Sequence, residues 1–226
     1  MIDGHCHILP GCDDGSPDMD YSVKMLEAAK ASGIDSIIFT PHTKGNFADK
    51  KKQERIYKKI IPIADTLGIN TTLGTEVHWK KLAELDLKDL RSKTLGNSNL
   101  FLIEFSLNEL PYIWKKIIED LKAQDLKVVI AHPERYVDIQ EDYDIAKQMK
   151  DLGCMFMLSA TFIHPNLMGW EMSKTAKKMI KDGFADMIAS DAHSVENYTF
   201  IGPAIDYAIN HGYNLKSADK ILYEAF

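Results

Sequence analysis

Two histidines separated by a single residue end the first β-rich run of this 226-residue chain. The run, residues 1–8, contains His5-Cys6-His7. Alternate side chains of a β-strand point to the same side, so both imidazoles can bind one cation, whereas a helix would direct them apart. The alternative is a hydrogen-bonded structural pair, but two imidazoles aimed at one point repel each other when protonated. The spacing therefore favours a metal site, with Cys6 packed on the opposite side of the strand.

Further residues of metal-binding types follow the other apolar runs. These are Asp14, His42, Glu76, Glu104, His132, Asp191 and His193. Any one of them alone is more often a structural or surface residue. Because the carboxyl ends of parallel strands meet at one rim, their repeated occurrence at strand ends predicts one shared metal centre. Asp13 is expected to bond only the local backbone of its Asp-Asp-Gly turn. The remaining histidines are expected to be structural or surface residues: His78, His164 and His211.

Seven β-rich runs alternate with helical patterns along the chain. The predicted strands cover residues 1–8, 34–40, 70–76, 100–105, 126–131, 154–158 and 185–190. The predicted helices cover residues 18–32, 50–67, 112–124, 142–152, 173–182, 203–211 and 217–225. This alternation predicts parallel strands joined by helices in a single domain over residues 1–226. Periodicity alone leaves a closed barrel and an open sheet equally possible.

The composition is that of an ordinary globular domain. Hydrophobic residues make up 45% and charged residues 27% of the chain, as in proteins with one packed core. The 33 acidic residues outnumber the 27 basic ones, so attraction to nucleic acid phosphates is not expected. No apolar run approaches 18 residues, so membrane insertion is not expected. The three cysteines, an odd number without a CxxC pair, favour a reducing cytoplasmic location.

Five blocks of sequence give the chain a resemblance to a known family. They are Asp3-Gly4-His5-Cys6-His7-Ile8-Leu9-Pro10 with Asp13-Asp14-Gly15, then Thr40-Pro41-His42, Ile103-Glu104-Phe105, Ala131-His132-Pro133-Glu134-Arg135-Tyr136 and Ser190-Asp191-Ala192-His193. In this order they resemble the polymerase and histidinol phosphatase (PHP) superfamily, specifically its bacterial tyrosine-protein phosphatases of capsular and exopolysaccharide synthesis, the CpsB/YwqE type. The resemblance implies an α/β fold, a distorted seven-stranded (β/α) barrel of TIM-like form. It also implies three divalent metal ions, usually Mn²⁺, at the carboxyl rim.

The resemblance assigns the candidate ligands to three metal sites. The first metal would be held by His5, His7 and Asp191. A bridging Glu76 would join it to a second metal, held also by Glu104 and His132. The third metal would be held by Asp14, His42 and His193. Fe, Zn, Co or Mg are possible in place of Mn²⁺, because nitrogen and oxygen ligands do not by themselves select one of these ions.

The implied reaction is hydrolysis of a phosphate monoester. A hydroxide shared by the metals is expected to attack phosphorus, with Glu76 as the bridging carboxylate. Arg135 is expected to bind the phosphate, and its alternative role is a surface salt bridge with Glu134. Lys44 is a weaker candidate for the phosphate site, because a lysine in a Lys-Gly turn is commonly exposed. No cysteine begins a Cys-x5-Arg phosphate loop, so a cysteine nucleophile is not expected.

The implied substrate is a phosphotyrosine protein, in particular a bacterial tyrosine kinase of capsular or exopolysaccharide biosynthesis. Two departures from the family pattern leave the substrate open. Tyr198 ends a loop in which many relatives carry an arginine, and Met157-Leu158-Ser159-Ala160 lacks an Asn-Ser pair. A phosphatase of histidinol phosphate or another small molecule is the first alternative. A non-catalytic binding module that retains its metals is the second. The sequence does not predict the oligomeric state.

Overall fold

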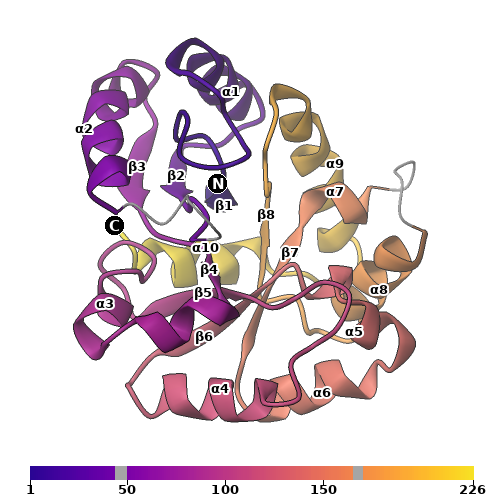
Figure 1. Cartoon of the computed structure of the whole chain (residues 1–226). Helices are drawn as coiled ribbons and strands as arrows, with labels where there is room; N and C mark the ends of the chain where they lie inside the picture. Colours follow the sequence, from indigo (N-terminus) through magenta and orange to yellow (C-terminus); the bar gives the residue numbers. More distant parts are fainter. Residues whose placement is uncertain (44–49, 165–169) are drawn as a thin grey trace.

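The computed structural model describes residues 1–43, 50–164 and 170–226. Strands and helices alternate along the chain (Figure 1). The strands are β1 (Ile2–Cys6), β2 (Ser36–Phe39), β3 (Asn70–Leu73), β4 (Val77–His78), β5 (Leu100–Glu104), β6 (Lys127–Ala131), β7 (Met155–Ser159) and β8 (Met187–Ala189). The longer helices are α1 (Met19–Ala31), α2 (Lys50–Thr66), α4 (Trp114–Lys122), α6 (Asp144–Asp151), α8 (Trp170–Lys181), α9 (Ile201–Ile209) and α10 (Leu215–Tyr223). The shorter helices, with 3₁₀ helices labelled η, are η2 (Trp79–Glu84), α3 (Leu87–Arg91), η3 (Pro133–Arg135), α5 (Val137–Glu141), α7 (Ala160–Ile163) and η4 (Val195–Phe200).

The described strands form two parallel sheets. One has the order β1-β2-β3 and the other the order β4-β5-β6-β7-β8. Two isolated parallel bridges link the sheets, between Cys6 and Ala192 and between His42 and Glu76. Next to the first bridge, the backbone N–H of Asp191 donates to the carbonyl oxygen of His5 at 2.9 Å. Because every strand pair is parallel, the carboxyl ends of the strands of both sheets lie around one region. The predicted parallel α/β class is confirmed.

The segment predicted as the third strand is divided between the two sheets. β3 ends at Leu73 and β4 begins at Val77, so the prediction of one strand over residues 70–76 is wrong. A Cβ at Gly74 would lie 2.8 Å from Cδ2 of Leu95. Glycine therefore lets the backbone pass close to Leu95 where the chain leaves one sheet for the other. Eight described strands in two sheets do not confirm a seven-stranded barrel.

Local signals place the helices that cover the strands. Asp18 caps α1 by accepting from the backbone N–H of Tyr21 at 2.8 Å, and Gly33 follows the helix with φ +83°, a left-handed conformation that glycine adopts readily. The buried face of α4 consists of Trp114, Ile117, Ile118 and Leu121. This i, i+3, i+4, i+7 spacing is that of an amphipathic helix on a core. None of the helices in the described part of the chain is both long and apolar enough to cross a membrane.

Candidate metal centre

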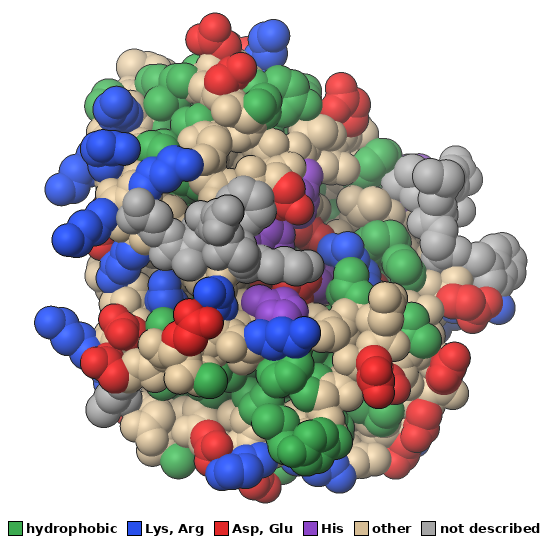
Figure 2. Space-filling view, viewed as in Figure 1, with side chains coloured by type: hydrophobic (Ala, Val, Ile, Leu, Met, Phe, Trp, Pro, Cys, Tyr) green, Lys and Arg blue, Asp and Glu red, His purple; other side chains and the backbone are tan. Residues whose placement is uncertain are grey.

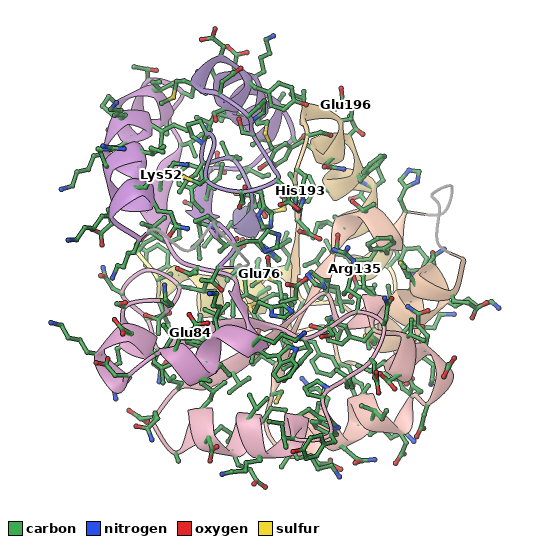
Figure 3. All side chains as sticks on the ribbon, in the orientation of Figure 1. Lys52, Glu76, Glu84, Arg135, His193 and Glu196 are labelled. Carbon is green, nitrogen blue, oxygen red and sulfur yellow. The ribbon has the colours of Figure 1, made fainter. Side chains whose placement is uncertain are left out.

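The predicted ligands lie together at the carboxyl ends of the strands. Histidines occupy a central depression of the surface (Figure 2), and the side chains of Glu76, Arg135 and His193 lie around it (Figure 3). Three sets of residues could each hold a metal ion, because the ligand atoms within each set lie within 4.8 Å of one another. The sets are His5, His7 and Glu76; His42, Glu76 and Glu104; and His7, Asp14, His42 and His193. Asp191 contacts the first set and His132 contacts the second.

The pair of histidines on the first strand converges on one point, as their spacing predicted. The two Nε2 atoms of His5 and His7 lie 3.2 Å apart. Oε2 of Glu76 lies 3.4 Å from His5 Nε2 and 3.6 Å from His7 Nε2. Oδ1 of Asp191 lies 3.7 and 3.5 Å from the same two nitrogens. Ligands on one tetrahedral ion with bonds of about 2.0–2.1 Å lie about 3.3–3.4 Å apart. These four side chains therefore fit the donor spacing of a single divalent cation.

Glu76 is the carboxylate at the middle of the cluster. Its side chain is fully buried, and its Oε2 lies 2.6 Å from His42 Nδ1 while its Oε1 lies 3.0 Å from His132 Nε2. His132 Nε2 also lies 3.8 Å from Oε1 of Glu104. The two oxygens of Glu76 thus face different histidines, which is the arrangement required of a carboxylate that bridges two ions.

A third group of ligand types lies nearer to solvent. Oδ1 of Asp14 lies 3.3 Å from His42 Nε2 and 3.5 Å from His193 Nε2. The ring of His193 stacks on that of His7, with centroids 4.0 Å apart. His7 therefore lies between this outer group and the inner group around Glu76. Since Asp14 is largely exposed, the outer group is the part of the cluster most accessible to a substrate.

Buried carboxylates change the pKa values of the histidines among them. Burial opposes protonation of His42, but the negative charge of Glu76 and a hydrogen bond with Asp14 outweigh it and raise the pKa to about 11. Burial likewise opposes protonation of His7, but hydrogen bonds with Asp13 and Asp191 raise its pKa to about 9. Burial also opposes ionisation of Asp191, yet the nearby His5 lowers its pKa. The cluster therefore holds positive charge as protons, which divalent cations would displace on binding.

Asp13 orients the ligand histidines, a role that the sequence did not reveal. Its Oδ1 accepts from the backbone N–H of Gly15 at 3.0 Å, which confirms the predicted turn. Its Oδ2 also lies 2.7 Å from His7 Nδ1 and accepts from the backbone N–H of His42 at 3.1 Å. A carboxylate on the second ring nitrogen fixes the tautomer and direction of a ligand histidine. Only the position of Asp13 beside Asp14 in the turn could have suggested this role.

Asp3 joins the first strand to the last beneath the cluster. It is fully buried and accepts from the backbone N–H of Ser190 at 2.9 Å and from the Ser190 hydroxyl at 2.6 Å. The hydroxyl of Tyr198 also donates to Asp3, at 3.3 Å. Tyr198 is therefore a buried structural residue.

Two ligand residues have unusual backbone conformations. His132 has φ +33° and Asp191 has φ +51°, a left-handed region that residues other than glycine seldom adopt. His132 follows the end of β6 directly, and Asp191 lies two residues beyond the end of β8, so both side chains reach the cluster from turns at strand ends. Such strain is typical of functional sites, because the surrounding structure must stabilise it.

Arg135 lies at the edge of the cluster and lines its hollow. Its Nη1 donates to Oδ2 of Asp191 at 3.3 Å, and its guanidinium lies 5.8 Å from the ring centroid of Phe162. The hollow has a volume of about 340 Å³ and also borders Asp14, His42, Glu104, Leu107, His132, Asp191 and His193. Glu134 instead accepts from the backbone N–H of Ser159 at 2.8 Å. Arg135 is thus paired with a ligand carboxylate rather than with Glu134. Lys44 lies outside the described residues.

The remaining residues follow the sequence predictions. Cys6 is buried on the other side of β1, where its Sγ lies 3.7 Å from the carbonyl oxygen of Ile38. His78 is buried, and its Nδ1 accepts from the backbone N–H of Lys80 at 3.4 Å. His211 is exposed and contacts the carbonyl oxygen of Tyr207. These histidines are structural or surface residues, as expected.

Comparison with known proteins identifies the family. Residues 1–225 match the sequence model of the family described as "Capsular polysaccharide synthesis, CpsB/CapC". The chain belongs to this family. Two similar members are the putative tyrosine-protein phosphatase CapC of Staphylococcus aureus and the tyrosine-protein phosphatase YwqE of Bacillus subtilis (strain 168). CapC is 29% identical over 205 residues, 89% of this chain and 80% of CapC, and YwqE is 28% identical over 206 residues, 88% of this chain and 80% of YwqE.

Solved structures support the same fold. A structure from work on YwqE of Bacillus subtilis and CpsB of Streptococcus pneumoniae, described as metal-dependent tyrosine phosphatases, matches with a TM-score of 0.80. The match has 24% identity and covers 100% of this chain and 96% of the other. The phosphotriesterase homology protein of Escherichia coli, with phosphate in its active site, matches with a TM-score of 0.58 at 12% identity, over 100% of this chain and 97% of the other. Both likenesses concern the fold alone.

Proposed function

We propose that this member of the CpsB/CapC family is a metal-dependent phosphatase that hydrolyses phosphotyrosine in proteins. The observation that carries the proposal is the convergence of buried imidazole and carboxylate ligands beside Arg135 at one hollow. The names of the family relatives supply the substrate class, since CapC and YwqE are described as tyrosine-protein phosphatases. A tyrosine kinase of capsular or exopolysaccharide synthesis is the proposed partner. We also infer that the two sheets together form a distorted barrel of the TIM-like type.

The ligand set is proposed to hold three divalent ions. The first ion would be held by His5, His7 and Asp191, the second by Glu104 and His132, and the third by Asp14, His42 and His193. Glu76 would be a ligand shared by the first two. Mn²⁺ is the proposed ion, although the nitrogen and oxygen donors fit other divalent metals. When bound, such ions supply positive charge to the phosphoryl oxygens and lower the pKa of a water molecule towards neutrality.

Arg135 is proposed to bind the phosphoryl oxygens of the substrate. Its Nε is buried and has no hydrogen-bond partner among the described residues. The contact of its Nη1 with Asp191 holds the guanidinium at the edge of the hollow, so an N–H group remains for a phosphate. A guanidinium can donate two parallel hydrogen bonds to a phosphate and stabilises the charge that develops on it. A tyrosine leaving group has a pKa of about 10, so its departure needs little help from a general acid.

The test is phosphate release by metal-stripped protein before and after addition of Mn²⁺. The substrates are a phosphotyrosine peptide and histidinol phosphate, and the variants are His5→Ala and Arg135→Ala, with Arg91→Ala as a matched control away from the site. We expect Mn²⁺ to restore cleavage of the peptide and Arg135→Ala to lower kcat/KM by roughly 10²–10³-fold, as for loss of a transition-state donor. A preference for histidinol phosphate would move the chain to the small-molecule phosphatases. No turnover with any divalent ion would leave a non-catalytic binding module.

A further inference from the structure

Three hollows adjoin one another, and the first of them lies at the metal centre. The metal-centre hollow shares Glu104 and Leu107 with a second hollow of about 570 Å³, between η2 and the loop after β5. The second hollow shares Lys80 with a third, of about 500 Å³, between η2, α3 and α4. Each volume lies in the range of about 300–1,000 Å³ in which proteins bind ligands. Neighbouring hollows share lining residues and therefore adjoin one another.

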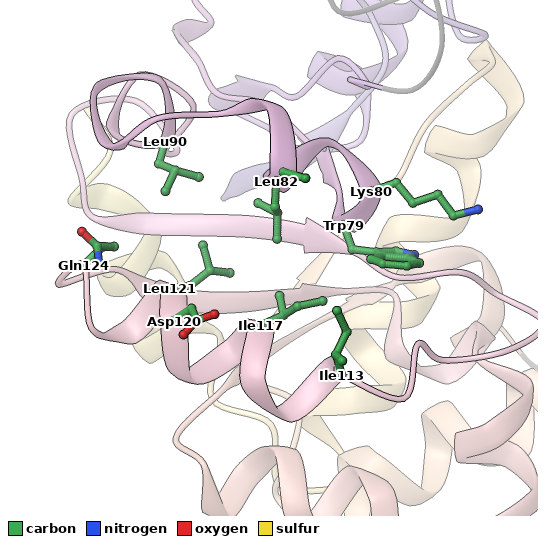
Figure 4. Close-up of a pocket in the computed structure, with 10 residues that line it drawn as sticks. Trp79, Lys80, Leu82, Leu90, Ile113, Ile117, Asp120, Leu121 and Gln124 are labelled. Carbon is green, nitrogen blue, oxygen red and sulfur yellow. The ribbon is translucent and has the colours of Figure 1, made fainter.

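The third hollow is an apolar groove, and we refer to it by that name. Its walls include Trp79 and Leu82 of η2 on one side and, on the other, Ile113 at the start of α4 with Ile117 and Leu121 of α4. Figure 4 shows Leu90 and Gln124 at one end of the groove and Trp79 with Lys80 at the other, beside the carboxyl end of β5. Lys80, at the second of these ends, also lines the second hollow, which adjoins the metal centre. An apolar side chain that covered it would remove apolar surface of both partners from water.

Trp79 forms a fixed boundary between the second hollow and the apolar groove. Its indole Nε1 donates to the hydroxyl of Ser106 at 3.0 Å, and Ser106 lines the second hollow. The ring therefore presents a rigid apolar surface to the groove while its polar edge faces the second hollow. Rigid aromatic residues of this kind are typical anchors of binding sites.

The second hollow is lined by two lysines, Lys80 and Lys81, and by two glutamates, Glu84 and Glu104. Lys81 is paired with Glu84, with 3.1 Å between Nζ and Oε2. Lys80 is exposed, its Nζ lies 5.7 Å from the ring centroid of Trp79, and it makes no ion pair with any residue in the described ranges. A cation thus lies between the metal centre and the apolar groove. An anionic side chain of a bound polypeptide would complement it.

We propose that these hollows select the sequence around the phosphotyrosine of the substrate. With the phosphate at the metal centre, the polypeptide places an acidic side chain beside Lys80 and an apolar side chain in the groove formed by Trp79, Leu82 and Ile113. This inference rests on the proposed phosphatase function and adds a sequence preference to it. The row of adjoining hollows between the groove and the reaction site favours a substrate segment as the occupant of the groove, and a second copy of this chain is the competing occupant.

The experiment compares kcat/KM for phosphotyrosine peptides in the Mn²⁺-loaded, full-length protein. Glu and Leu are scanned through four positions on each side of the phosphotyrosine in an otherwise all-alanine peptide. We expect higher kcat/KM for Glu near the phosphotyrosine and Leu farther out, both on the same side. Lys80→Ala should remove a Glu advantage of roughly three- to fivefold, the size expected for an exposed charge pair. Lys115→Ala, an exposed lysine of α4 outside the three hollows, is the matched control.

The groove is tested by filling it. Ala83 is an exposed residue of its wall, so Ala83→Phe can occupy the groove without disturbing the core. We expect this variant to lose a Leu advantage of roughly tenfold, the size expected for burial of one apolar side chain. Neither Ala83→Phe nor Lys80→Ala should change hydrolysis of p-nitrophenyl phosphate, which has no flanking residues.

The outcomes separate this inference from the proposed function. If the protein cleaves all phosphotyrosine peptides equally, or if both variants keep the wild-type preferences, the inference is overturned and the phosphatase function stands. If no phosphotyrosine substrate is cleaved, both fail. If Ala83→Phe changes the mass in sedimentation rather than the peptide preference, the groove is an interface between copies of this chain and the inference is overturned.

Discussion

The metal centre and the apolar groove lie close together but differ in the polarity and burial of their side chains. Glu76 and Trp79 are three residues apart, yet Glu76 is fully buried among histidines while Trp79 forms a wall of an open apolar hollow. The polar groups of the metal centre contact one another and are largely removed from water. The groove presents apolar side chains to water. The comparison suggests that reaction and substrate selection depend on separate sets of residues that are positioned by one short segment.

The largest loss of activity is expected from a substitution within the metal centre itself. Glu76→Gln replaces a carboxylate that faces His5, His7, His42 and His132 with a neutral amide that binds divalent ions poorly. We expect phosphotyrosine hydrolysis to fall by more than the roughly 10–100-fold typical of changes to residues that only orient a metal ligand. The check is kcat/KM with metal content measured on the same sample. Full activity with a normal metal content would show that Glu76 is not a ligand.

A smaller effect is expected from the residue that orients the ligands. Asp13→Asn keeps the shape of the side chain and the bond to Gly15, but it weakens the contact with His7. We expect metal affinity or kcat/KM to fall by roughly 10–100-fold, measured by Mn²⁺ titration of activity. Recovery of the rate at high Mn²⁺ would assign the loss to affinity. An unchanged titration curve would contradict the positioning role of Asp13.

Removal of the metals should lower stability, because bound ions stabilise only the folded chain. Occupancy of one site at 100 times its Kd contributes about 2.7 kcal/mol, which corresponds to roughly 5–11 °C in Tm for a chain of this length. The measurement is thermal unfolding with chelator and then with excess Mn²⁺. Glu76→Gln protein is the control, and an equal Mn²⁺-induced rise in that variant would place the stabilising ion elsewhere.

The smallest effect concerns the groove alone. Ile117 lies in the wall of the apolar groove and packs through α4 onto the core. Ile117→Val removes one methylene, which costs about 1 kcal/mol and about 2–4 °C in Tm. Hydrolysis of p-nitrophenyl phosphate should remain at the wild-type rate. A loss of that activity in the folded variant would show that groove and metal centre are not separable.

Spacing at strand ends was sufficient to predict which residues gather at the centre. The alternation of a strand brought His5 and His7 to one point, and the common direction of parallel strands brought Asp14, Glu104 and His193 towards it. Both effects follow from local backbone geometry, which sequence patterns record directly. The metal occupancy of these residues stays a prediction.

Other features depend on packing between distant segments and had no local signal. The break between β3 and β4 depends on the approach of Leu95 to Gly74, and the buried role of Tyr198 depends on Asp3 at the other end of the chain. The row of hollows likewise arises only where η2, the loop after β5 and α4 meet. The hydrophobic pattern of a sequence predicts which face of each helix or strand is buried, but it does not predict which helices and strands pack against one another.

The most direct test of the central claim is anomalous X-ray scattering at the manganese edge from crystals of the Mn²⁺-loaded protein. We predict peaks within coordination distance of His5, His7, Asp14, His42, Glu76, Glu104, His132, Asp191 and His193, with Glu76 between two of them. The absence of peaks at these side chains in crystals of active protein, or peaks confined to other parts of the surface, would contradict the proposed metal centre.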